Sequence, residues 1–570
     1  MCVHVQDGRN RRPWVRIRTF LGLLIVVGIF PSCGRANYIH KVAIFISTKH
    51  CLGFLLGSLT DKEHIEDIDP QGPELSEHIR RFVQELALAG YQLDRSAFDY
   101  LRTMGEPEAA TIAKSVLVRI GETPKASPIL TKKELLEMTP HPPVIPVSVP
   151  VATRIASKEI SSRVEVIRDP SKMLGTGGGI DDFSHYFRDR FQKLLTAFRA
   201  RQDVRDATSI STALRASQNQ KVKFVAMVVE KRERQEKMFM QLDDLEDNVT
   251  ILVSSEERAA FPIAQKIPLD QVVCVEGVRA KGDLIVAKQI LLPDIPDHKP
   301  RLANEEVWAV LMSDLHVGSK KFLKEQLSRV FDWLNLKVGD KNQREIAERV
   351  KYVVICGDIV DGIGIYPRQE QELEIVDLYE QYKEAAKYIR RIPDQIETII
   401  LPGNHDAVRQ ALPQPAIPKD FGEPLYEARK VISIGNPSEI TLHGVRLLLH
   451  HGRSLDDLIA SVPNLDFTQP EKAMRLQLQC RHLAIEYGKR TAIAPEKTDH
   501  LVIETVPDIF QSGHIHVMKY ENYRGTQIIN SGAWQAQTDY QRRGGVVPTP
   551  GILTVVNLQN LQVRPIDFMH

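Results

Sequence analysis

The chain has 570 residues, too many for one compact core, so we expect several domains. Hydrophobic residues make up 43% of the sequence and charged residues 26%, which excludes a disordered chain, a collagen-like repeat and a polytopic membrane protein. The 74 basic residues nearly cancel the 73 acidic ones, so net charge neither favours nor excludes a nucleic-acid partner.

Residues 1–60 are an N-terminal extension whose role stays open. Arginines precede a short apolar run, 20–30, and Pro31-Ser32-Cys33-Gly34 follows it. This is the order of features in a signal peptide, and the run is too short to span a bilayer. The alternatives are a buried segment or an extension absent from the working protein. Because the rest of the chain is typical of an intracellular protein, we expect a cytoplasmic location.

The six cysteines lie far apart and form no CxxC pair. This spacing argues against a zinc ribbon and against a disulfide framework. We expect most of them to be buried thiols in a reducing compartment.

Residues 70–120 predict a small helical domain. Apolar residues at near-helical spacing from Leu75 to Leu86 indicate a helix, and a shorter one is expected around Ser96–Leu101. Seven prolines crowd the stretch from Pro124 to Pro150, so residues 121–180 are interpreted as a linker.

Residues 181–300 predict an amphipathic helix followed by a small β-barrel. Five short β-rich segments lie between Val222 and Ile290, separated by polar turns. So many strands in so short a stretch favour a closed barrel such as an OB-fold. Single-strand binding needs stacking side chains, for which only Phe224 and Phe239 are available. A scaffold role is therefore the favoured interpretation of the barrel.

Residues 301–570 alternate apolar strands with helices, and polar clusters follow the strands. An aspartate after a strand is commonly a helix cap, so each cluster alone is weak evidence. Together they are informative, because the carboxyl ends of strands gather active sites in α/β sheets. The clusters contain Asp314 and His316; Asp358; Asn404, His405 and Asp406; His450 and His451; and His514 and His516.

The residue types in these clusters predict a centre of two divalent metal ions. A pair of ions can clamp the attacking and leaving oxygens of a phosphoester. Carboxylate, imidazole and amide donors suit Mn²⁺ or Fe²⁺ better than Ca²⁺, so Mn²⁺ is expected, with Mg²⁺ or Fe²⁺ as alternatives. Side chains alternate along a strand, so His450 and His451 face opposite sides. We expect His451, next to Gly452, to be the ligand; a strand register shifted by one would make it His450.

These motifs resemble the calcineurin-like metallophosphoesterase superfamily, whose fold is a two-sheet sandwich flanked by helices. The resemblance implies that Asp314, His316, Asp358 and His516 hold one ion. It assigns Asp358, Asn404, His451 and His514 to the other, with Asp358 bridging. It also implies that His405 is a non-ligand acid assisting the leaving oxygen and that Asp406 orients it.

Three longer motifs are similar to the small subunit of the archaeal family-D DNA polymerase, over roughly residues 180–570. They are Gly357–Pro367 (GDIVDGIGIYP), His451–Asp457 (HGRSLDD) and Trp534–Gln541 (WQAQTDYQ). The resemblance implies a 3′→5′ exonuclease that proofreads on single-stranded or primer-template DNA. The implied partner is a large catalytic subunit, to which DNA synthesis belongs.

The expected fold class is therefore multidomain α/β: a helical N-terminal domain, an OB-fold barrel and a metallophosphoesterase sandwich. Two other functions remain open. One is a non-catalytic scaffold subunit of the polymerase, against which the complete ligand set argues. The other is a stand-alone metallophosphatase, which would need neither the linker nor the barrel.

Overall fold

The structure, a computed structural model, describes residues 156–570 without a gap, and before them only 15–18, 24–27 and parts of 82–135. The chain divides into two units, Met1–Val151 and Ala152–His570, each described here by itself. Within the residues described, no helix combines the length and the apolar character needed to cross a membrane.

The described part of the first unit is small. The run predicted as a signal-peptide-like segment contains β2 (Leu24–Val27), which pairs antiparallel with β1 (Val15–Arg18); most of residues 1–60 lies outside the described residues. The shorter predicted helix corresponds to α2 (Arg95–Arg102), while residues 75–81 of the longer one are not described. Strands β3 (Gln92–Leu93) and β4 (Ile129–Leu130) pair in parallel. A buried apolar cluster holds the unit together: Phe82, Leu86, Tyr91, Ala97, Leu101, Val116, Leu130 and Leu135.

The second unit contains a closed five-stranded barrel with the strand order β10-β8-β7-β6-β9. Its strands are β6 (Lys221–Arg234), β7 (Lys237–Asp243), β8 (Asn248–Ser254), β9 (Val272–Arg279) and β10 (Leu284–Leu291), matching the five predicted segments. Alternate residues of β7 and β8 are buried, as expected for strands that turn one face to a barrel core. Phe224 is fully buried in that core, so it offers no stacking face, and Phe239 is half-buried.

The remainder of the second unit is a sandwich of two six-stranded sheets. The first has the order β14-β13-β12-β11-β20-β21 and the second β18-β19-β17-β16-β15-β5. The first sheet comprises β11 (Trp308–Met312), β12 (Val350–Cys356), β13 (Glu397–Leu401), β14 (Ile432–Ser433), β20 (Ile552–Asn557) and β21 (Val563–Asp567). The second comprises β5 (Val164–Arg168), β15 (Ser438–Leu442), β16 (Val445–Leu449), β17 (Ile509–Ser512), β18 (Lys519–Tyr523) and β19 (Thr526–Asn530).

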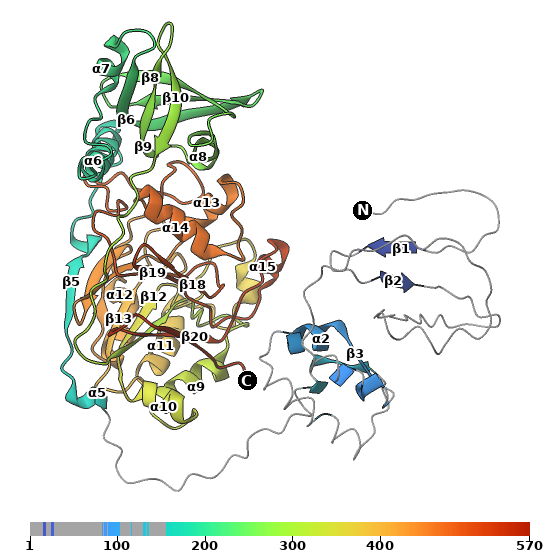
Figure 1. Cartoon of the computed structure of the whole chain (residues 1–570). Coiled ribbons are helices and arrows are strands. Elements are labelled where there is room, and N and C mark those ends of the chain that lie inside the picture. Colours follow the sequence, from blue (N-terminus) through green and yellow to red (C-terminus); the bar gives the residue numbers. More distant parts are fainter. Residues whose placement is uncertain are drawn as a thin grey trace, which may run out of the picture. The chain divides into compact units, whose positions relative to one another are not determined.

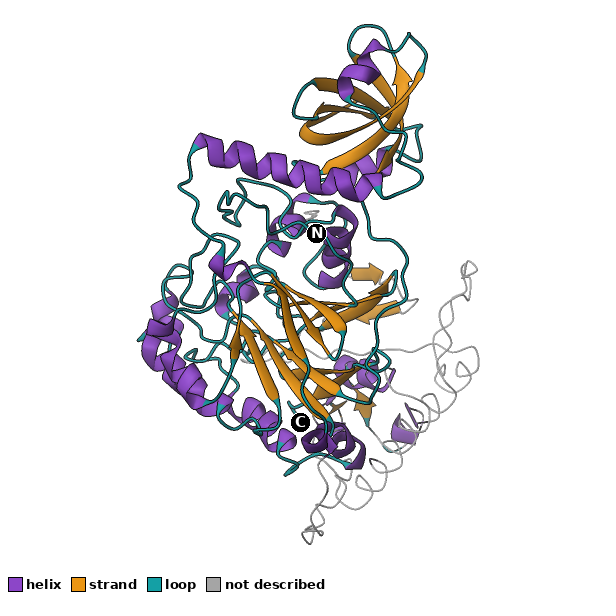
Figure 2. Ribbon diagram, turned by 90° about the vertical axis from the view of Figure 1, so that its left-hand side faces the viewer, coloured by secondary structure: helices purple, strands orange, loops and turns teal. Residues whose placement is uncertain are grey.

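Helices cover the outer faces of both sheets (Figures 1 and 2). The central strands are buried on both faces, and their residues alternate between two cores. Val310 of β11 packs toward helices, whereas its neighbour Leu311 packs toward the second sheet. Against the first sheet lie α9 (Lys324–Leu334), α10 (Lys341–Ala347), α11 (Leu378–Ile389) and α12 (Lys419–Ala428). Against the second lie α13 (Leu455–Ser461) and α14 (Pro470–Cys480).

Part of the predicted linker 121–180 forms regular structure. Strand β5 pairs antiparallel with β15 at the edge of the second sheet, more than 260 residues away along the chain. The helix α5 (Ala156–Glu159) and a 3₁₀ turn, Pro170–Lys172, flank it. From residue 156 on, this segment therefore belongs to the sandwich, while the predicted domain boundaries as a whole remain a prediction.

The cysteines within the described residues follow the expectation from the sequence. Cys274, Cys356 and Cys480 are buried free thiols.

The predicted amphipathic helix, α6 (Ile180–Arg199), joins the barrel to the sandwich. Phe191, Leu194 and Phe198 pack against barrel strands β6 and β9. On the sandwich side, the buried guanidinium of Arg190 forms an ion pair with Asp499 at 2.8 Å. Removing one partner of such a buried pair leaves an uncompensated charge, so this contact fixes the position of α6.

The buried imidazole of His482 extends this network and predicts a pH dependence of stability. His482 Nε2 donates to Asp499 Oδ2 at 2.9 Å, and its Nδ1 accepts from the Ala484 amide at 3.1 Å, an arrangement of the neutral ring. Burial, followed by the positive charge of Arg190, lowers the pKa of His482 to about 4 from 6.5.

Between pH 6.5 and 4 the unfolded chain therefore binds a proton at His482 that the folded chain does not. Folding stability decreases as pH falls through this window, by up to ~3 kcal/mol from this group. We expect His482→Gln to flatten the pH dependence of the urea midpoint between pH 6.5 and 4.5. Parallel pH profiles in the wild type and the variant would contradict this assignment.

Candidate metal centre

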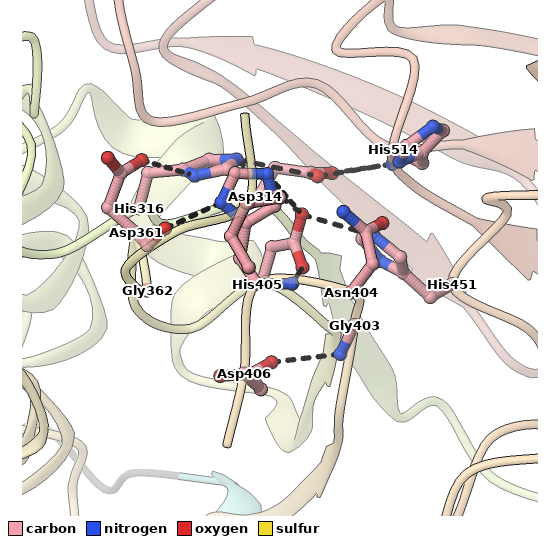
Figure 3. Close-up of polar contacts among 12 residues, drawn as sticks. Asp314, His316, Asp361, Gly362, Gly403, Asn404, His405, Asp406, His451 and His514 are labelled. Atoms are coloured by element: carbon pink, nitrogen blue, oxygen red, sulfur yellow. Dashed lines mark hydrogen bonds and ion pairs between the residues drawn. The ribbon is translucent and has the colours of Figure 1, made fainter. Parts of the chain in front are cut away.

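The predicted ligands come together at one end of the sandwich because their strands end there. Strands β11, β12 and β13 run parallel in the first sheet, and β16 and β17 run parallel in the second. The polar clusters follow the carboxyl ends of these five strands, and Figure 3 shows their side chains converging. The fold thus unites residues as far apart in sequence as Asp314 and His516.

Among the residues that the structure describes, three groups of side chains are close enough to hold a cation. Their ligand atoms lie within 4.8 Å of one another in each group, and Asp358 belongs to two of the groups. His316 Nε2 and His516 Nε2 are 3.0 Å apart, and His451 Nε2 is 3.2 Å from Asp358 Oδ2. The groups are Asp314, His316 and His516; His316, Asp358 and His405; and Asp358, His451 and His514.

The histidine rings are held by hydrogen bonds from their outer nitrogens. Nδ1 of His316 donates to Asp361 Oδ1 at 2.8 Å, and Nδ1 of His451 donates to the Cys356 carbonyl at 2.9 Å. With the proton fixed on Nδ1, the Nε2 lone pair of each ring is directed toward the neighbouring carboxylates. His514 is held from its other nitrogen, since its Nε2 lies 3.1 Å from Asp456 Oδ2.

Several of these residues occupy an unfavourable backbone conformation. Asp314, His316, Asp358, His514 and His516 all have a positive φ, between 51° and 67°. Each such residue costs roughly 1–3 kcal/mol, and strain of this kind concentrates at functional sites. Glycine permits the tight packing around them, because a Cβ on Gly357 would collide with the His451 ring and one on Gly403 with the Asp358 carboxylate.

The charge states of the cluster suit a cation. Burial acts to raise the pKa of Asp358, but the positive charges of His451, His405 and His316 outweigh it and hold that pKa well below its usual range. Burial opposes protonation of His451, yet Asp358 raises its pKa to about 9. A cation would take the place of that proton, because metal ligands must be deprotonated.

A buried atom without a hydrogen-bond partner supports the fit of a cation to this cluster. It is Asn404 Oδ1. Leaving a buried polar atom unpaired costs about 1–3 kcal/mol, so such atoms point to a missing partner. Carboxylate, imidazole and amide oxygen donors together are a set that fits Mn²⁺ or Fe²⁺.

The rings of His450 and His451 point to opposite sides, because side chains alternate in direction at the end of strand β16. His450 is fully buried, and its ring nitrogens lie 3.0 Å from Asn436 Oδ1 and 3.1 Å from Ser454 Oγ. Burial first, and then the charge of His451, lowers the pKa of His450 to about 3. His451, not His450, therefore faces Asp358.

His405 and Asp406 are not in the relation expected from the sequence. The His405 ring is oriented by the Asp361 carbonyl, which accepts from Nδ1 at 2.6 Å. The Asp406 carboxylate accepts instead from the Gly403 amide at 2.8 Å, a contact drawn in Figure 3. It also accepts from the Tyr382 hydroxyl at 3.0 Å. Asp406 thus braces the loop that carries Asn404 and His405, and burial, then the charge of Asp358, raises its pKa to about 6.

Further residues within the sequence motifs form hydrogen bonds with the predicted site residues. Asp361 contacts His316 through its carboxylate and His405 through its carbonyl, and Gln535 donates to Asp361 Oδ1 at 2.9 Å. Gln541 lies 2.8 Å from His516 Nδ1. Only the spacing of Asp361, three residues after Asp358, could have indicated such a role; the glutamines carry no sequence signal.

Two histidines of the cluster, His405 and His514, are partly exposed to solvent. An open pocket of about 350 Å³ borders the cluster, with His405, Asp406, Ile363 and Phe421 among its lining residues. The side chain of His405 is 13% exposed, whereas His316 and Asp358 are almost fully buried. A substrate entering from this side would meet His405 first.

Comparisons with known proteins give the family. A family model for the B subunit of DNA polymerase alpha/epsilon matches residues 309–518. The DNA polymerase II small subunit of Archaeoglobus fulgidus is 40% identical over 392 residues, 69% of this chain and 78% of the relative. That of Methanothermobacter thermautotrophicus is 36% identical over 486 residues, 85% of this chain and 98% of the relative. A solved archaeal phosphodiesterase covers 46% of this chain and 99% of its own, at 14% identity and a TM-score of 0.24, a likeness too weak to assign a fold. By its similarity to the curated relatives, this chain belongs to the family of DNA polymerase II small subunits.

Proposed function

We propose that the chain is the small subunit of a two-subunit archaeal replicative DNA polymerase and carries its 3′→5′ exonuclease activity on single-stranded DNA. The observation that supports this most directly is the cluster itself. Its carboxylate, imidazole and amide groups meet at one end of the sandwich, where the buried Asn404 Oδ1 has no hydrogen-bond partner. A purely architectural subunit would have no need of a strained and incompletely bonded centre.

Two divalent ions are proposed to bind here, Mn²⁺ being the expected species and Mg²⁺ or Fe²⁺ the alternatives. One would be held by Asp314, His316, Asp358 and His516, and the other by Asp358, Asn404, His451 and His514. When bound, such ions polarise a phosphoryl oxygen and lower the pKa of water. The protein contributes the fixed orientation of its donors, for which Asp361, Cys356 and Asp456 supply the hydrogen bonds.

His405 is proposed as the acid that delivers a proton to the leaving oxygen. Its Nδ1 is engaged by the Asp361 carbonyl, so Nε2 remains available on the side of Asp358, 3.9 Å from Oδ2. That placement suits proton transfer at Nε2, in a partly buried position that lines the pocket.

The domain organisation proposed for this function follows the expected boundaries, with the helix and barrel at 181–300 and the metallophosphoesterase sandwich at 301–570. The barrel order, with β8 and β10 parallel and the other pairs antiparallel, supports an OB-fold. Two stacked sheets between helices, with ligands at the strand ends, support the metallophosphoesterase assignment. The proposed partners are the large catalytic subunit and single-stranded or primer-template DNA, in the cytoplasm.

The proposed function is tested with a 5′-labelled single-stranded oligonucleotide and Mn²⁺, using the chain alone and together with the large subunit. We expect stepwise shortening from the 3′ end. Cleavage of p-nitrophenyl phosphate or a phosphopeptide without DNA shortening would instead identify a stand-alone phosphatase. Stable binding to the large subunit without any hydrolysis would identify a scaffold.

His405→Ala distinguishes an acid from a ligand at this position. We expect a reduction in the hydrolysis rate of about 10²–10⁴-fold, the usual contribution of general acid–base assistance, with bound Mn²⁺ unchanged. Metal content by mass spectrometry and single-turnover rates on DNA measure the two effects separately. Because His405 also shares a potential ligand group with His316 and Asp358, loss of an ion from the variant would assign His405 to metal binding.

A further inference from the structure

The short helix α15 (Asp539–Arg543) connects to the metal-ligand cluster at two points. Gln541 Nε2 lies 2.8 Å from Nδ1 of His516. The Tyr540 ring stacks on the Tyr366 ring, with centroids 5.2 Å apart and an interplanar angle of 24°. Tyr366 in turn lies 6.4 Å, centroid to centroid, from the His405 ring. These contacts, from two separate segments, place the tyrosine pair at the edge of the cluster (α15 is labelled in Figure 1).

Tyr540 is an exposed aromatic ring with a fixed orientation. It is 60% exposed although one of its faces is covered by Tyr366, so the opposite face is turned to solvent. Single exposed apolar residues are common and need no explanation. A ring backed by a second, half-buried ring next to His405 is different, because its position is fixed before a ligand arrives and little conformational freedom is lost on binding.

Exposed cationic side chains lie close to Tyr540 along the chain and on the segment that adjoins α15. Arg542 and Arg543 follow Tyr540 and are exposed. Arg542 forms a 3.2 Å ion pair with Asp539, but both side chains are more than half exposed, so the pair is weak and exchangeable. Lys321, also exposed, belongs to the segment whose carbonyl accepts from the Ala536 amide just before α15. Cations around an aromatic face are the combination that binds single-stranded nucleic acid.

We propose that the solvent-facing side of Tyr540 stacks on the base of an unpaired 3′-terminal nucleotide and thereby positions the strand at the cluster. Tyr366 supports the ring, and Arg542, Arg543 and Lys321 contact the phosphates. Stacking accepts any base, because every base has a π-face, but it requires that face to be uncovered. Tyr540 therefore acts as a positioning residue that selects unpaired ends, an inference that rests on the proposed nuclease function.

The test measures binding in EDTA, where no hydrolysis can occur, with a single-stranded oligonucleotide carrying 2-aminopurine at its 3′ end. Tyr540→Ala is expected to weaken binding about 5- to 100-fold and to reduce the quenching of 2-aminopurine fluorescence. Tyr540→Phe, which keeps the ring, should retain both the wild-type affinity and the wild-type quenching. Tyr520→Ala is the matched control, since Tyr520 of β18 is 46% exposed and is outside the proposed platform. An oligonucleotide with an abasic 3′ end should bind wild type and Tyr540→Ala equally.

With Mn²⁺ present, Tyr540→Ala should raise KM for the oligonucleotide by a similar factor, with kcat changed less than about threefold. If wild type shortens DNA but Tyr540→Ala matches it in binding, quenching and KM, the positioning role is wrong and the nuclease proposal stands. If wild type does not shorten DNA, the nuclease proposal itself fails.

Discussion

Asp358→Ala is expected to abolish phosphodiester hydrolysis, with a loss of at least about 10³-fold. The Asp358 carboxylate belongs to two potential ligand groups, and it lies 3.2 Å from His451 and 3.7 Å from His316. Without it, two neighbouring cations would repel each other with no negative charge between them. Bound metal ions lower the activation free energy of such reactions by several kcal/mol, and each 1.36 kcal/mol of activation free energy is a factor of ten in rate.

Asp358→Asn is the matched variant that separates chemistry from folding. Asparagine has nearly the same shape and tolerates the positive φ of 52° at this position. Adding Mn²⁺ should raise the melting temperature of the wild type, because a ligand that binds only the folded state stabilises it, and should not raise that of either variant. Near wild-type hydrolysis by Asp358→Ala would show that the assignment of a two-ion centre is wrong.

The adjacent pair His450 and His451 provides the second large effect. His451→Ala is expected to lose one of two bound ions and nearly all activity. His450→Ala should keep both ions, because its ring faces Asn436 and Ser454 rather than Asp358. We expect His450→Ala to lower the free energy of unfolding by about 1–3 kcal/mol, since it removes a hydrogen-bond partner from buried polar groups.

Metal content and melting temperature of the two variants are measured on the same preparations. A reversed result, with ions lost from His450→Ala and retained by His451→Ala, would move the ligand by one residue. A loss of ions from both would show that the strand end is distorted by either change, and His450→Gln, which keeps a hydrogen-bonding side chain, then resolves the two roles.

The strands that carry the centre could be predicted because each has a local signature. Buried strands such as β11 contain continuous apolar residues, and the ligands follow directly after them. The five barrel strands are recognisable for a related reason, since each is a short β-rich segment bounded by polar turns. Both signals lie within a few neighbouring residues and need no knowledge of distant contacts.

Features that depend on distant contacts were not predictable. Strand β5 has a mostly exposed side-chain pattern, and its pairing partner β15 lies far along the chain. The hydrogen bond from His405 to the Asp361 carbonyl is a backbone contact, which the type of residue does not encode. The family resemblance implies that Asp406 orients His405, yet the loop turns the Asp406 carboxylate toward Gly403 and Tyr382.

Titration of metal-free protein with Mn²⁺, with bound ions and DNA hydrolysis measured on the same samples, tests the central proposal most directly. The account predicts two ions per chain, and 3′→5′ shortening of single-stranded DNA that rises with occupancy of the second ion. It also predicts that Asp358→Asn neither binds two ions nor shortens DNA. Hydrolysis by metal-free protein, or two bound ions without any hydrolysis of DNA, would contradict it.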